Sequence, residues 1–308
     1  MLRDGDSQLG VQSTISSKRL LLTIIINFSI TLAEIIGGIL TGSLALLSDA
    51  LHNFSDGFAI ILAYVAHRYS IRSSNSKQTF GYKRAEILSA FINSIILIAI
   101  CIYLFYEAIK RLWEPLPIEG ELMLIIAFIG LLGNLACVLI LKRDISSNIN
   151  VKAAYLHLLG DTLSSVAVIV GAVLIVALGI YWLDPLLSMA IALYILKETF
   201  DITKETVDIL MQSAPKNLDI EKIRQCMMTI PEIKDIHHIH LWRLNDSQIH
   251  FECHVELNRD LSVSESGIII EQAGKILREE FNIAHTTFQI EYDFNHNKKI
   301  IYNSPNCC

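Results

Sequence analysis

The sequence has little charge for its length, and this scarcity indicates its class. Only 18% of the 308 residues are charged, while 52% are hydrophobic and stand in long runs. A soluble core of this size would interrupt such runs with polar stripes. Residues 1–17 are polar and lack the apolar stretch of a cleaved signal peptide. We therefore expect a membrane protein whose first apolar segment is its own targeting signal.

Several chemical motifs are also missing. No stretch fits G-x-x-x-x-G-K-[ST], which argues against nucleotide hydrolysis as an energy source. No H-E-x-x-H stretch supplies the glutamate base of an intramembrane zinc hydrolase, which also needs an open coordination position for water. The six cysteines form no C-x-x-C pair; we expect Cys101 and Cys137 to pack in apolar spans, and Cys226 and Cys253 in a small core. Neither enzymatic activity nor a nucleic-acid partner is expected.

The apolar runs predict six transmembrane helices within residues 18–210, because a bilayer demands about 20 apolar residues per helix. The last run is shorter than that. The expected spans are Leu20–Leu40, Ser43–Ala66, Ala85–Ile109, Leu122–Leu141, Ala153–Leu178 and Trp182–Leu196.

Basic residues predict the orientation, since positive loops stay in the cytoplasm. They gather before the first span and in the loops after the second and fourth spans, at Lys18, Arg19, Arg68, Arg72, Lys77, Lys83, Arg84, Lys142, Arg143 and Lys152. Lys110 and Arg111 go against this rule. Both termini should be cytoplasmic, including the polar tail 1–17.

Two matched pairs of ionisable residues lie inside the apolar runs. His52 with Asp56, and His157 with Asp161, repeat one H-x-x-x-D spacing, which returns to the same face of a helix. A single such residue could be a polar side chain bonded between helices. Two matched pairs instead favour a substrate path, because ionisable side chains are costly in a membrane. Together they would form a four-ligand metal site.

The ligand types favour zinc in that site. Two imidazoles and two carboxylates suit tetrahedral Zn²⁺ better than Mg²⁺ or Ca²⁺, which prefer more oxygen ligands. Two aspartates also neutralise the charge of the ion, whereas an empty site should take up protons. Protons and zinc would then compete, as a proton-driven antiporter requires. A passive divalent-metal channel and an exporter of another divalent transition metal remain alternatives.

After about residue 211 the sequence changes to that of a small acidic cytoplasmic domain. Residues 211–295 predict an α-β-β-α-β order with split βαβ character. The helices are expected at Leu218–Thr229, capped by Asn217 or Asp219, and Ser264–Phe281, and the strands at Asp235–Leu244, Gln248–Leu257 and Thr286–Tyr292, with a hairpin turn at Asn245-Asp246. The tail 296–308 ends in Cys307 and Cys308.

One face of this predicted sheet carries side chains that bind metals. His250, Glu252, His254 and Glu256 alternate with apolar residues, although an ordinary solvated face explains any single one of them. Strand parity places His237 with Ile239 and Leu241, so His237 serves as a ligand only if its strand begins after it. Cys307 and Cys308 are either a flexible thiol tail or further ligands.

Several motifs resemble the zinc-type signatures of the cation diffusion facilitators. They are Ser48–Asp56 in the second span, Ala154–Asp161 in the fifth, Phe80–Glu86 entering the third, Arg111–Pro115 leaving it, and Asp184-Pro185 opening the sixth. The resemblance implies a homodimer of six-helix subunits, each joined to a metallochaperone-like domain, exporting cytoplasmic Zn²⁺ in exchange for protons. It places the transport site on His52, Asp56, His157 and Asp161, with cadmium as a further substrate.

The resemblance also implies regulatory zinc ligands near His237, His254 and Glu291. Gly267 and Gln289 stand where some relatives have histidines, so a binuclear site is doubtful and a single site completed by Cys307 or Cys308 is a rival. The loop 143–151 lacks the long histidine-rich insert of many eukaryotic vesicular members. A bacterial plasma-membrane exporter therefore fits best.

Overall fold

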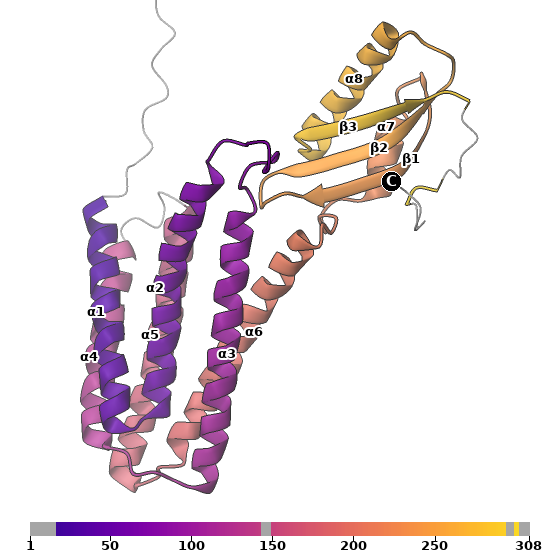
Figure 1. The fold of residues 1–308 in the computed structure, drawn as a ribbon. Coiled ribbons are helices and arrows are strands. Elements are labelled where there is room, and N and C mark those ends of the chain that lie inside the picture. Colours follow the sequence, from indigo (N-terminus) through magenta and orange to yellow (C-terminus); the bar gives the residue numbers. More distant parts are fainter. Residues whose placement is uncertain (1–16, 143–148, 294–298, 302–308) are drawn as a thin grey trace, which may run out of the picture. The chain divides into compact units, whose positions relative to one another are not determined.

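The computed structural model describes residues 17–142, 149–293 and 299–301. They comprise six long helices followed by a small α/β domain (Figure 1). By contacts the chain divides into two units, Met1–Leu62 with Ile92–Ile202, and Ala63–Phe91 with Thr203–Cys308. Cys307 and Cys308, predicted as a thiol tail or as metal ligands, lie outside the described residues.

The six long helices match the six predicted runs in order. They are α1 Ser17–Thr41, α2 Leu44–Ser70, α3 Ala85–Trp113, α4 Gly120–Lys142, α5 Ile149–Leu178 and α6 Leu183–Leu210. The last helix is longer than the predicted span Trp182–Leu196, because α6 stays helical through the charged residues after Leu196. Charged residues are good helix formers, so the end of an apolar run need not end a helix.

Among the described helices, four are long and apolar enough to cross a membrane: Leu22–Thr41 of α1, α3, α4, and Tyr155–Leu178 of α5. The remaining long helices, α2 and α6, carry more charged residues along their lengths. In α2 these include Asp49 and Asp56, which stand inside the helix. Hydropathy alone therefore establishes a helical membrane domain with four strong spans.

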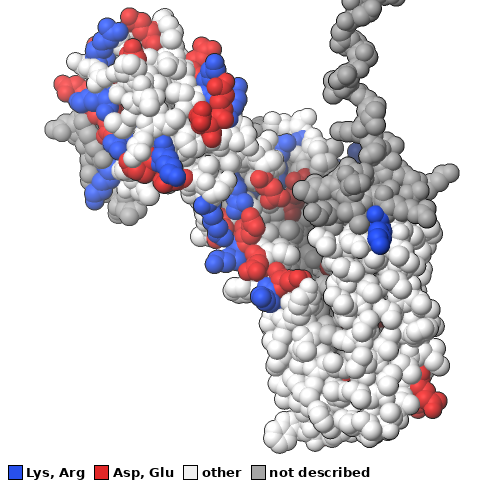
Figure 2. Space-filling model, turned by 180° about the vertical axis from the view of Figure 1, so that it is seen from behind, with Lys and Arg blue, Asp and Glu red and all other residues white. Residues whose placement is uncertain are grey.

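The surface of the helical bundle is apolar. Ile60, Ile102 and Leu163 are 62%, 60% and 67% exposed, which would be unfavourable in water and is suited to lipid. Figure 2 shows an almost uncharged surface over the bundle, while Lys, Arg, Asp and Glu side chains gather over the C-terminal domain and the charged part of α6. Hydrophobic surface of this extent matches the acyl chains of a bilayer.

Glycine allows helices α1 and α4 to pack closely. A Cβ atom at Gly133 of α4 would lie only 2.1 Å from Cδ1 of Ile30 in α1. In a membrane, where lipid competes with apolar side chains for contact, such close backbone approach supplies much of the packing energy between helices. Helix α4 also packs on α5, so it links α1 to the helix that carries His157.

Asp184 at the start of α6 caps the start of α2. Its carboxylate accepts hydrogen bonds from the hydroxyl of Ser43 (2.5 Å) and from the backbone N–H groups of Leu44 (2.8 Å) and Ala45 (3.2 Å). These amides have no acceptor within α2, since the first N–H groups of a helix lack intrahelical partners. Because Asp184 and all three donors are buried, the acceptor is a structural requirement.

We expect Asp184→Ala to lower the free energy of unfolding of the purified protein by about 3 kcal/mol, since it leaves several buried donors without an acceptor. Thermal unfolding in detergent measures the effect. Asp201→Ala, at an exposed position of the same helix, is the control and should change stability little. Equal stability of the two variants would contradict the capping role.

The C-terminal domain has the predicted α-β-β-α-β order. Its elements are α7 Ile220–Met227, β1 Ile233–Arg243, β2 Ile249–Leu257, α8 Val263–Phe281 and β3 His285–Glu291. Strand β2 pairs antiparallel with β1 and parallel with β3, so β2-α8-β3 is a βαβ unit. The helices begin as their sequences indicate: Asp219 caps α7, and Ser262 with Glu265 forms a capping box on α8.

The core of this domain follows the predicted alternation of β2. Phe251, Cys253, Val255 and Leu257 are buried in one cluster with residues of both helices. Burial raises the pKa of the Cys253 thiol, which makes this cysteine unreactive. Cys101 and Cys137 are buried among the long helices, as expected. Cys226 was expected in the small core, but it is only partly buried and lies outside the cluster.

Candidate metal sites

Helices α2 and α5 bring the two predicted His–Asp pairs together. Asp56 Oδ2 lies 3.6 Å from His52 Nε2 and 3.2 Å from His157 Nε2. Asp161 lies 4.0 Å from His52 Nε2 through Oδ1, and 3.7 Å from His157 Nε2 through Oδ2. Each carboxylate therefore contacts both imidazoles, and the four side chains alternate His, Asp, His, Asp around a common centre.

These distances suit one small metal ion. Ligand atoms about 2.0–2.1 Å from tetrahedral zinc lie roughly 3.3 Å from one another. The four His–Asp distances of 3.2–4.0 Å are close to this value. These are the distances between unlike ligands only, and the four residues are not among the groups of described residues whose ligand atoms all lie within 4.8 Å of one another, so the side chains must move closer together to hold one ion. An oxygen-preferring ion with six or more ligands would leave positions that these four residues do not fill.

The four residues differ in their access to the surface. The side chain of Asp161 is 4% exposed and that of His52 is 12% exposed, whereas His157 is 46% exposed. A cavity of about 580 Å³ reaches the set, lined by His52, His157 and Asp161 together with residues of α6 that include Glu198. An acidic residue at the side of the cavity favours the approach of a cation. An ion can therefore reach this set from the surface of the bundle.

Buried polar atoms in the set lack hydrogen-bond partners. Nδ1 of His52 and one oxygen each of Asp56 and Asp161 are buried without a hydrogen bond among the described residues. Of these atoms, Asp56 Oδ2 lies 3.2 Å from His157 Nε2 and Asp161 Oδ2 lies 3.7 Å from the same nitrogen, so their nearest charged partner is an imidazole. Two imidazoles and two carboxylates are donor types that fit a divalent metal ion.

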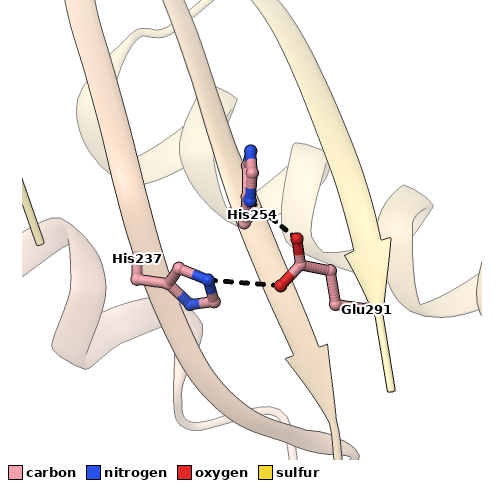
Figure 3. Close-up of side chains that lie close together, drawn as sticks. All are labelled: His237, His254 and Glu291. Atoms are coloured by element: carbon pink, nitrogen blue, oxygen red, sulfur yellow. Dashed lines mark ion pairs between the residues drawn. The ribbon is translucent and has the colours of Figure 1, made fainter. Parts of the chain in front are cut away.

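A second cluster lies on the sheet of the C-terminal domain, where the ligand atoms of His237, His254 and Glu291 lie within 4.8 Å of one another. One side chain comes from each strand, and the carboxylate of Glu291 points between the two histidines (Figure 3). Its oxygens lie 2.7 Å from His254 Nδ1 and 3.2 Å from His237 Nε2. Neither ring nitrogen of His237 makes a hydrogen bond, although this side chain is 3% exposed.

Strand parity predicted that His237 would share a face with Ile239 and Leu241 unless the strand began after it, and this prediction is wrong. Strand β1 begins at Ile233, before His237, and a register shift lies between His237 and His240. His238 has φ +51°, so the extra residue is a β-bulge. The bulge changes the phase of the strand, so that His237 pairs with His254 while Ile239 still enters the core. A bulge has no strong signature in a single sequence.

Neighbouring side chains hold this cluster in place. The amide of Gln289 donates a hydrogen bond to Glu291 (3.0 Å). The ring of His238 stacks on that of His254 at 4.5 Å between centroids. Burial, followed by the charges of His254 and His240, lowers the pKa of His238. Gln289 thus orients a predicted ligand, as outer-shell groups of metal sites do. At Gly267 of α8, where some relatives have a histidine, a Cβ atom would meet no other atom within 4 Å.

Three buried polar residues beside the His–Asp set were not among the predicted site residues. Glu34 of α1 and Asp49 and Asn53 of α2 are 1%, 1% and 3% exposed. The signal was available, because an acidic residue within an apolar span indicates function in the same way as His52 does. Glu34 stands in the first apolar run with no basic partner four residues away.

We expect Glu291→Gln to lower the number of zinc ions bound by the full-length protein by about one, because a neutral amide is a poor zinc ligand. Equilibrium dialysis with metal analysis measures this number. Glu252→Gln, at an exposed position of the same sheet, is the matched control. Equal stoichiometry in both variants would show that Glu291 binds no metal.

Comparison with known proteins agrees with a membrane-embedded carrier of metal ions. Residues 20–211 match the family model described as the cation efflux transmembrane domain, and residues 215–293 match that of the cation efflux protein cytoplasmic domain. The chain belongs to the cation efflux family.

Relatives match along most of their length. The "Cadmium, cobalt and zinc/H(+)-K(+) antiporter" of Bacillus subtilis is 38% identical over 93% of this chain and 93% of its own. The "Zinc transporter ZitB" of Escherichia coli is 36% identical over 90% and 88%, respectively. The "Metal cation efflux system protein CzcD" of Cupriavidus metallidurans is 35% identical over 84% and 82%.

Proposed function

We propose that this protein exports zinc, and also cadmium, from the cytoplasm in exchange for protons. The observation that carries the proposal is the alternating set of two imidazoles and two carboxylates between α2 and α5. The names of the relatives, which include zinc transporters and metal/proton antiporters, support the choice of ions. Within this proposal His52, Asp56, His157 and Asp161 bind the transported ion.

Charge explains the exchange. With a divalent ion bound, the two aspartates and the ion sum to no net charge, which a low-dielectric site tolerates. Without the ion, two close carboxylates repel each other and favour protonation of the site. Metal must displace those protons, so a site that opens in turn to each side of the membrane exchanges one cation for the other. Four protein ligands leave little room for a catalytic water, which favours a carrier over an enzyme.

The remaining parts of the proposal concern assembly and location. All six long helices cross the membrane. Helix α2 is less apolar because it carries site residues, and α6 is less apolar because it carries charged residues after Leu196. The membrane domain covers 18–210, the cytoplasmic domain 211–295, and the tails 1–17 and 296–308 lie with it in the cytoplasm. The subunits form a homodimer, and the location is the cytoplasmic membrane of a bacterium. The family of the C-terminal domain supports a dimer.

In this proposal the C-terminal cluster binds regulatory zinc. His237, His254 and Glu291 supply three ligands, and Cys307 or Cys308 supplies a fourth. Three protein ligands leave one of the four tetrahedral positions open, which a thiolate is suited to fill. Zinc bound here would report the cytoplasmic concentration of the substrate, because the ligands belong to the cytoplasmic domain.

We expect His157→Ala and Asp161→Ala to abolish zinc uptake into everted vesicles, a loss of at least about tenfold, since each removes one of four ligands. The control is His67→Ala, which removes an exposed imidazole of α2. Collapse of the proton gradient should stop uptake by the wild-type protein. Uptake that continues after collapse would indicate a passive channel, and full activity of either ligand variant would contradict the site.

We expect His52→Asp to admit harder ions, because a carboxylate in place of an imidazole makes the ligand set richer in oxygen. The ratio of manganese to zinc uptake in proteoliposomes should rise relative to wild type. Ser73→Asp, at an exposed position after α2, places the same carboxylate outside the set and should leave this ratio unchanged. An unchanged ratio in His52→Asp would mean that His52 does not contact the transported ion.

A further inference from the structure

A buried polar cluster lies beside the His–Asp set and is not part of it. It joins four helices and consists of Glu34 (α1), Asp49 and Asn53 (α2), Asn134 (α4), and Ser164 and Ser165 (α5). Glu34 and Asp49 are each 1% exposed. Two carboxyl groups at this depth in a membrane domain are costly unless they are neutralised or have a role.

The two carboxyl groups have different partners. Asp49 accepts hydrogen bonds from the hydroxyls of Ser164 (2.6 Å) and Ser165 (3.4 Å), which stabilise its ionised form. Glu34 accepts one long hydrogen bond, from the amide of Asn53 (3.4 Å). No lysine or arginine is among the buried side chains of the described residues. Of the two carboxyls, Glu34 therefore has the weaker support for a negative charge and is the better candidate to carry a proton.

The amide of Asn53 is suited to a protonated Glu34. Its Nδ2 donates to Glu34 Oε2, but its own oxygen, Oδ1, is buried without any donor among the described residues. A carboxylic acid and a primary amide can pair through two hydrogen bonds, O–H to the amide oxygen and N–H to the carboxyl oxygen. Protonation of Glu34 would supply the missing donor, and its loss leaves Oδ1 unsatisfied, which costs free energy.

Helix α4 shapes this position. A Cβ atom at Gly130 would lie 2.1 Å from Oε1 of Glu34, so the carboxyl group lies directly against the backbone of α4. The charged groups that act on Glu34 are Asp49 from α2 and Asp161 from α5, while α4 faces it with Gly130. Both aspartates disfavour an ionised Glu34 when no metal is present.

We infer that Glu34 is a proton-binding site separate from the metal ligands, and that it releases its proton when metal binds to the His–Asp set. This inference rests on the antiport proposed above. A divalent ion beside Asp161 cancels the negative field on Glu34 and favours its ionisation. By reciprocity, a proton on Glu34 weakens metal binding without competing for a ligand.

The test counts protons released per zinc ion bound by the full-length protein, using a pH indicator in weakly buffered detergent solution. We expect Glu34→Gln to bind zinc and to release about one proton fewer than wild type, because the amide cannot titrate. Glu34→Asp, which restores a titratable group, should recover the proton. Glu121→Gln, at an exposed position on α4, is the control and should match wild type.

Infrared difference spectra provide a second readout that a purely structural role would not change. Zinc binding should reduce the absorption of protonated carboxyl groups in wild type and in Glu121→Gln. It should do so less in Glu34→Gln. An equal proton count and an equal infrared change in Glu34→Gln would overturn the inference.

Two other outcomes separate this inference from the antiport itself. Wild-type protein that binds zinc without releasing any proton refutes the proposed exchange as well. An unchanged proton count in Glu34→Gln, together with loss of a potassium effect on zinc transport, would assign Glu34 to an alkali cation and overturn the proton site. If Glu34→Gln does not fold, the infrared spectra of wild type and Glu34→Asp are compared instead: the protonated-carboxyl band that zinc binding removes should shift in position in Glu34→Asp, and an unshifted band would overturn the inference.

Discussion

Asp56 and Asp161 face the same two imidazoles inside an apolar bundle, and the cost of burying their charge constrains the surrounding structure. Such a pair is tolerable only when cations balance it. This requirement explains why His52 and His157 lie between the carboxylates, and why a cavity connects the set to the surface. It also extends to Asp49, whose charge acts on both Asp161 and Glu34.

The cluster in the C-terminal domain depends on the register of its three strands. A sheet gives each strand only two faces, so three candidate ligands from three strands meet only if their registers agree. Pairing of His254 with Gln289, and of Glu256 with Glu291, fixes β3 relative to β2. The bulge at His238 then brings His237 onto the same face. One residue of irregular backbone thus decides whether a third ligand is present.

The sequence predicts those features that depend on a fixed period along the chain. The pairing of His52 with Asp56 follows from the helical repeat, and the core of β2 follows from strand alternation. The approach of distant segments was predicted only for the two His–Asp pairs, whose matched spacing indicated one site on α2 and α5. The cap that Asp184 forms on α2 and the packing of Glu34 on Gly130 also join residues far apart in sequence, and no repeated pattern indicated them. The bulge in β1 escaped prediction because histidine fits a strand and a bulge equally well.

The bond between Asp184 and the start of α2 has a mechanical consequence. Ser43, Leu44 and Ala45 are tied to the first turn of α6 by three hydrogen bonds to one carboxylate. These hydrogen bonds fix the start of α2 relative to the start of α6. If α2 tilts about this fixed end, the displacement of a residue grows with its distance from the end. His52 and Asp56 lie about two to three helical turns away, so a small tilt displaces Asp56 further than His52.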